Sequence, residues 1–81
     1  MSKVIYKFGP ILIGQITEVE GFPIKVDLQD SDIFVWSVVN VGKYNRKLKC
    51  RVIPTCYEFE DERFIGTVVT PHGLVWHVIG K

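Results

Sequence analysis

The sequence predicts an all-β fold, either a small antiparallel sandwich or a partly open barrel, with about seven short strands ending in a β-hairpin. Segments rich in β-branched and aromatic residues recur along the 81 residues, and glycine, proline and aspartate separate them. Helical periodicity is almost absent. The most complete pattern is the hairpin over Arg63–Ile79, whose centre, Thr70-Pro71-His72-Gly73, matches a type I turn.

Three strands are predicted in the first part of the chain. Lys3–Phe8 ends at a Gly-Pro pair, and Ile11–Val19 ends at a Gly-Phe-Pro segment. Ile24–Gln29 alternates between apolar and polar residues, which is typical of a strand with one buried face. We therefore expect Ile24, Val26 and Leu28 to point into the core.

Two further strands precede the hairpin. Ile33–Val39 is nearly all apolar, so we expect this strand to be covered on both faces, by a second sheet or by another subunit. Arg46–Ile53 alternates again, and Pro54 stops it. The acidic stretch Glu58–Glu62 is predicted to lie in the longest loop.

Length and composition limit the possibilities. Residues 1–81 provide one all-β domain with a marginal core, so we expect a homo-oligomer to reinforce it. The net charge of +1 favours neither nucleic acid nor a membrane surface as partner. The start of the chain lacks the apolar core of a signal peptide, and free cysteines fit a reducing compartment, so we expect a cytoplasmic protein. The spacing of Cys50, Cys56, His72 and His77 predicts no metal site, and we expect no cofactor.

A basic face on the Arg46–Ile53 strand is the first candidate ligand site. Lys47, Lys49 and Arg51 recur at every second residue, which places them about 7 Å apart on one face. Two interpretations are open. The three cations bind a phosphate-bearing ligand, or they lie on an exposed strand face where the lysines prevent aggregation. The loop residues Thr55 and Tyr57 lie close by in the sequence and offer a hydroxyl and a phenol.

Other chemistry-bearing residues have simpler structural interpretations. Cys56 has no base beside it in the sequence, so we expect a packed small residue and predict no catalytic residue. His77 is interpreted as a satisfied or half-exposed polar side chain. Tryptophan side chains stack on nucleobases in some binding proteins. For Trp36 and Trp76 we favour core packing, because both lie in apolar strands. Carboxylates at positions 27, 30 and 32 are interpreted as a solvated turn.

Four segments occur in this order: Ile5-Tyr6-Lys7-Phe8, Trp36-Ser37-Val38-Val39-Asn40, Gly66-Thr67-Val68 and Gly73-Leu74-Val75-Trp76-His77-Val78. Together they resemble a family of short, uncharacterised all-β proteins encoded by bacteriophages and prophages. The chain departs from that family where Pro54-Thr55-Cys56-Tyr57 replaces a G-T-G-H segment.

The resemblance implies a phage accessory protein in the host cytoplasm, and three functions remain open. One is a homo-oligomeric sponge that sequesters a nucleotide-derived host immune signal, with Arg63 and the basic face holding its phosphates and Thr55 and Tyr57 nearby. Another is a protein-interaction module that inhibits a host protein through a strand edge or an apolar patch. The third, an enzyme acting on nucleotides, is least favoured because no nucleophile and base are paired.

Overall fold

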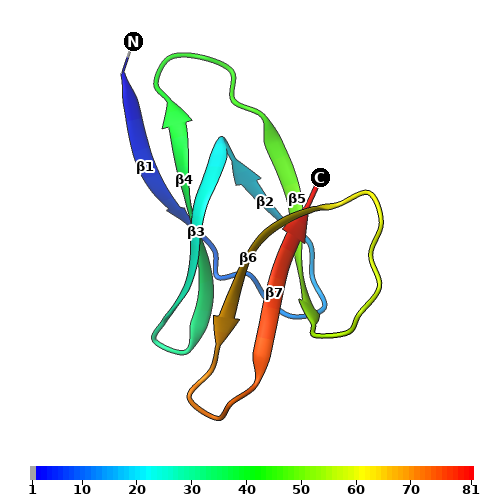
Figure 1. Cartoon of the computed structure of the whole chain (residues 1–81). Coiled ribbons are helices and arrows are strands. Elements are labelled where there is room, and N and C mark those ends of the chain that lie inside the picture. Colours follow the sequence, from blue (N-terminus) through cyan, green and yellow to red (C-terminus); the bar gives the residue numbers. More distant parts are fainter. Residues whose placement is uncertain (1) are drawn as a thin grey trace.

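The structure, a computed structural model that describes residues 2–81, is an all-β sandwich of seven strands in two antiparallel sheets (Figure 1). The first sheet has the order β1-β4-β3 and the second the order β2-β5-β7-β6. The strands are β1 (Lys3–Phe8), β2 (Thr17–Glu20), β3 (Phe22–Gln29), β4 (Asp32–Asn40), β5 (Lys47–Pro54), β6 (Arg63–Val69) and β7 (Val75–Gly80). The predicted fold class is confirmed, as a sandwich without a closed barrel.

The shortest connection between the two sheets is the corner at Gly21. β2 and β3 are separated only by Gly21, so the chain leaves the second sheet and enters the first at this residue. Gly21 has a φ of +88°, and its N–H donates to the Arg46 carbonyl at 2.7 Å. The buried Ser37 hydroxyl donates to the Glu20 carbonyl at 2.6 Å. The corner is therefore held from β4 and from the segment before β5.

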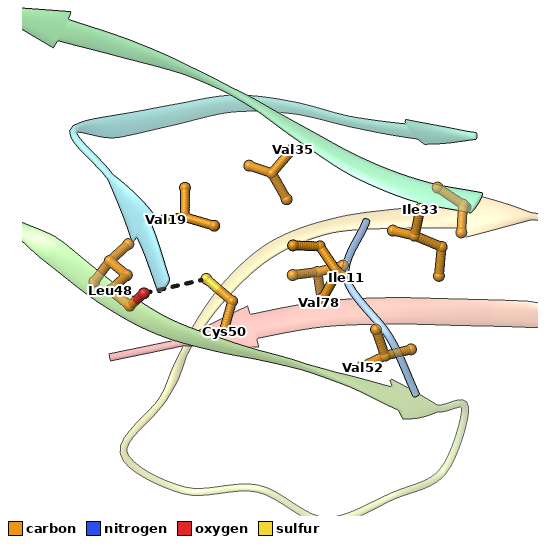
Figure 2. Packing of buried hydrophobic residues seen from close by; sticks show 9 residues of the cluster. Ile11, Val19, Ile33, Val35, Leu48, Cys50, Val52 and Val78 are labelled. Carbon is orange, nitrogen blue, oxygen red and sulfur yellow. Dashed lines mark hydrogen bonds between the residues drawn. The ribbon is translucent and has the colours of Figure 1, made fainter. Parts of the chain in front are cut away.

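The core lies between the sheets and consists of aliphatic side chains and one thiol. Figure 2 shows Val35 and Ile33 from the first sheet facing Leu48, Val52 and Val78 from the second. Alternation places Leu48, Cys50 and Val52 of β5 inward, as the sequence predicted. Burial raises the pKa of the Cys50 thiol to about 11, because the charged thiolate would lose its hydration.

The predicted strand Ile11–Val19 is wrong over most of its length. Only its end belongs to a strand, β2, and the residues before β2 form a turn in which the Gln15 N–H donates to Leu12. Ile11 is apolar because it enters the core, where its N–H donates to the Ile33 carbonyl at 2.8 Å. Ile13 and Ile16 stay exposed, so here apolar residues do not mark a strand.

The predictions that Ile24 points into the core and that Trp36 packs in the core are also wrong. A bulge between Pro23 and Lys25 shifts the register of β3, so Pro23 is buried and Ile24 is half exposed. Within residues 2–81 the second sheet packs on the inner face of β4 alone, so the outer face is only half buried, and Trp36 lies on that outer face rather than in the core. Cover of the outer face by another subunit stays a prediction. Trp76 packs against the core as predicted.

The hairpin of β6 and β7 has the predicted turn. The Gly73 N–H donates to the Thr70 carbonyl at 2.9 Å, and Gly73 has a φ of +83°. Cys56 differs from its prediction, because it is exposed in the loop after β5 with a φ of +70°. No helix within residues 2–81 has the length and apolar character needed to span a membrane.

Candidate anion-binding groove

A groove of about 580 Å³ opens at one end of the sandwich. The start of β1, the end of β4 and the loop between β4 and β5 form its walls, together with the Gly21 corner and the start of β6. The N-terminus and the β4–β5 loop lie at the same end of the molecule (Figure 1). The side chains that matter for its chemistry are Lys3, Phe22, Asn40, Tyr44, Arg46 and Arg63.

The β4–β5 loop, residues 41–46, is fixed by a buried asparagine. The Asn45 Oδ1 accepts from the Asn40 N–H at 2.9 Å, and its Nδ2 donates to the carbonyls of Asn40 at 2.9 Å and Lys43 at 3.1 Å. Asn45 is 6% exposed, whereas the neighbouring Tyr44 is 86% exposed. Because Asn45 uses its amide internally, Tyr44 and Arg46 on either side of it are held out toward the groove.

The opposite wall comes from the corner and from β6. The Arg63 guanidinium carbon lies 5.0 Å from the centre of the Phe22 ring, a cation–π contact between β6 and β3. This contact orients Arg63 but leaves its N–H donors free for a ligand. Lys3 pairs with Asn40 across β1 and β4, which places the third cation at the same end of the sheet.

The charged side chains that line the groove are all positive. Among residues 2–81, three cations, Lys3, Arg46 and Arg63, line the groove, and no carboxylate does. The ion pairs formed within residues 2–81 involve other cations, namely Lys25, Arg51 and Lys81. Uncompensated cations beside a concave surface attract anions, and arginine matches the geometry of phosphate oxygens.

The predicted basic face on β5 has a different environment. Lys47 pairs in register with Glu20 and Lys49 with Glu18, so both lysines lie opposite carboxylates on β2. Arg51 forms a two-point ion pair with Glu62, at 2.6 Å from Nε and 2.7 Å from a terminal nitrogen. Hydrogen bonding to Arg51 lowers the pKa of Glu62, and the same contact raises the pKa of Arg51.

The two predicted loop residues also have partners. The Thr55 hydroxyl lies 2.8 Å from His77 Nε2, while Thr67 lies 2.8 Å from Nδ1, so the half-buried His77 is satisfied on both sides. Tyr57 stacks near Arg51, with the guanidinium carbon 5.6 Å from the ring centre, and both line a second cavity of about 320 Å³. Among the six predicted ligand residues, only Arg63 lines the groove.

Sequence reasoning missed Lys3, Phe22, Tyr44 and Arg46. Their only local signal is the Tyr44-Asn45-Arg46 segment, in which an aromatic and a cation flank an asparagine where a predicted loop meets the predicted strand Arg46–Ile53. The other residues of the groove are far apart in the sequence and meet only through the strand order.

Comparison with known proteins gives a family without a described activity. Neither the curated proteins nor the solved structures include a significant match to this chain. A family model described as a domain of unknown function (DUF7352) matches residues 1–81. The chain therefore belongs to the DUF7352 family.

Proposed function

We propose that this protein is a non-enzymatic binding protein that captures a small phosphate-bearing ligand, such as a nucleotide, in the end groove. The observation that carries this proposal is the set of three cations, Lys3, Arg46 and Arg63, in a groove that no carboxylate of the described residues lines. The arginines would hold phosphate oxygens through charge-assisted hydrogen bonds, and Lys3 would add a third positive charge.

The aromatic residues of the groove favour a ligand that also carries a flat ring. Tyr44 is 86% exposed and Phe22 is 61% exposed, so both offer a ring for stacking. A volume of about 580 Å³ lies within the usual range for small-molecule sites. A nucleotide combines the required phosphate with a base that stacks on such rings.

The biological setting of the proposal comes from the sequence resemblance. We propose a phage-encoded accessory protein of the host cytoplasm that sequesters a nucleotide-derived immune signal, as a homo-oligomer. Exposed apolar side chains on β1, Ile5 at 61% and Tyr6 at 55%, support association with further subunits.

A second candidate function rests on the same strand. β1 is the edge of its sheet, and Val4, Ile5 and Tyr6 leave apolar side chains exposed on both of its faces. Such an edge suits a protein partner that adds a strand, as a host-protein inhibitor would. This function predicts pull-down of one partner protein, lost on substitution of Ile5 by lysine and unaffected by substitution of Arg63.

Isothermal titration calorimetry with nucleoside mono- and triphosphates tests the leading proposal. We expect Arg46→Ala and Arg63→Ala each to weaken binding roughly 10-fold or more, since each removes a charge-assisted hydrogen bond. Lys49→Ala is the matched control, because Lys49 is exposed and lies opposite Glu18, outside the groove. Equal loss in the control, or no binding by the unmodified protein, would contradict the proposal.

A further inference from the structure

The outer face of the β1-β4-β3 sheet carries aromatic rings between lysines. On β4, alternate residues point outward, and these include Phe34 and Trp36. In register, Trp36 lies between Lys7 of β1 and Lys25 of β3. Basic and aromatic residues therefore alternate from strand to strand across the sheet. This alternation is not visible along the sequence, because the residues come from three different strands.

On this face each of two lysines lies over an aromatic ring, and the Lys7 Nζ also donates to Gln29 Oε1 at 2.5 Å. The Lys7 Nζ lies 4.8 Å from the Phe34 ring centre, and the Lys25 Nζ lies 5.9 Å from the Trp36 ring centre. The two rings are 6.3 Å apart and half buried, which fixes them in the sheet. The side chains of Lys25 and its ion-pair partner Asp27 are more than half exposed, so this pair is weak and easily exchanged.

This face is continuous with the groove. Lys3, Phe22, Val38 and Asn40 belong both to the outer face of the sheet and to the groove lining. Asn40 lies six positions after Phe34 along β4, which corresponds to about 20 Å. Although the net charge of the chain is only +1, positive charge is concentrated on the surface formed by the groove and this face together. On the combined surface the cations are Lys3, Lys7, Lys25, Arg46 and Arg63, against the carboxylates Asp27 and Asp32.

We propose that this combined surface binds single-stranded nucleic acid, with one nucleotide in the groove and the following bases stacked along Trp36 and Phe34. The inference rests on the proposed function, because the groove would hold the first phosphate. On binding, Lys7 and Lys25 leave the ring faces and contact phosphates, while the bases take their places. Aromatic rings beside a line of cations recognise every base and the backbone without reading sequence. The length of the surface suits about four nucleotides, at the low end of such sites.

Fluorescence anisotropy with end-labelled oligothymidylates and oligouridylates of two, four and eight nucleotides tests this inference. We expect affinity to rise from two to four nucleotides and then to level off. Replacing both Lys7 and Lys25 by alanine should weaken the four-nucleotide complex about 10-fold. It should also reduce the salt slope of log affinity by about 1.4, since each lost phosphate contact contributes about 0.7.

Two controls separate this inference from the proposed function. Replacing both Lys47 and Lys49, which lie on the other sheet, should leave oligonucleotide binding unchanged. Trp36→Leu keeps an apolar side chain and should weaken the four-nucleotide complex while mononucleotide binding persists. Mononucleotide binding with no dependence on length would overturn the inference and leave the proposed function standing. Absence of binding to mononucleotides and oligonucleotides alike would overturn both.

Discussion

Replacing Gly21 with alanine tests the corner at which the chain passes from one sheet to the other. Gly21 has a φ of +88°, a conformation that costs an L-residue about 1–2 kcal/mol. An added Cβ would also press against the Val38 carbonyl oxygen and lie 3.1 Å from Ser37 Oγ. The first of these neighbours is backbone within a central strand, so it cannot move aside without disturbing β4.

The magnitude follows from these two effects. Overpacking against a rigid neighbour costs about 1–3 kcal/mol, so Gly21→Ala should lower the free energy of unfolding by about 2–5 kcal/mol in total. A domain of 81 residues has about 4–12 kcal/mol of stability at the usual value per residue. The substitution therefore removes a large part of the total, and the variant should be close to unfolding at 37 °C.

Gly14→Ala is the matched control. Gly14 has a similar φ of +84°, but an added Cβ there meets nothing within 4 Å. Urea titration followed by tryptophan fluorescence, with thermal melts in parallel, measures both variants. Gly14→Ala should lose only the backbone cost of about 1–2 kcal/mol, and its melting temperature should exceed that of Gly21→Ala by at least about 4 °C. Equal stability of the two variants would refute the steric argument for the corner.

The other predictions concern the cysteines and the ion pair beside β5. Ellman's reagent at pH 8 should label one thiol per native chain, the exposed Cys56, because burial keeps Cys50 protonated with a pKa of about 11. Cys56→Ser should abolish native labelling, and two fast-reacting thiols in the native wild type would contradict the burial. Arg51 lowers the pKa of Glu62 in the folded protein. The stability that their ion pair contributes is therefore fully present above the unfolded-state pKa of about 4.3, and it is lost as the pH falls through the lower pKa of the folded state. The stability difference between wild type and Glu62→Gln, followed by urea titration, should therefore shrink toward zero on acidification, and a constant difference would disprove this linkage.

The fold was predictable because most strands alternate visibly. β5 shows inward Leu48, Cys50 and Val52 between outward cations, and the final hairpin carries its own turn residues. The errors have local physical causes. Ile11 is predicted to lie in a strand, but it is an apolar loop residue that packs into the core. Ile24 points outward because of a β-bulge, and the sequence around it contains no residue that indicates a bulge.

The groove was not predictable in the same way. Its cations come from β1, from the β4–β5 loop and from β6, and only the strand order brings these segments together. The basic face on β5 was visible in the sequence because it is local. Its carboxylate neighbours Glu18 and Glu20 are on another strand, and pairing with β2 became evident only from the register.

Nuclear magnetic resonance shows directly where a nucleotide binds on this protein. A titration of the ¹⁵N-labelled protein with a nucleoside triphosphate, followed through the backbone amides, locates the ligand residue by residue. We expect shifts at Lys3, Phe22, Arg63 and the Tyr44–Arg46 segment, which line the groove. Shifts confined to Lys47–Arg51 or to the Thr55–Tyr57 loop, with none in the groove, would contradict it.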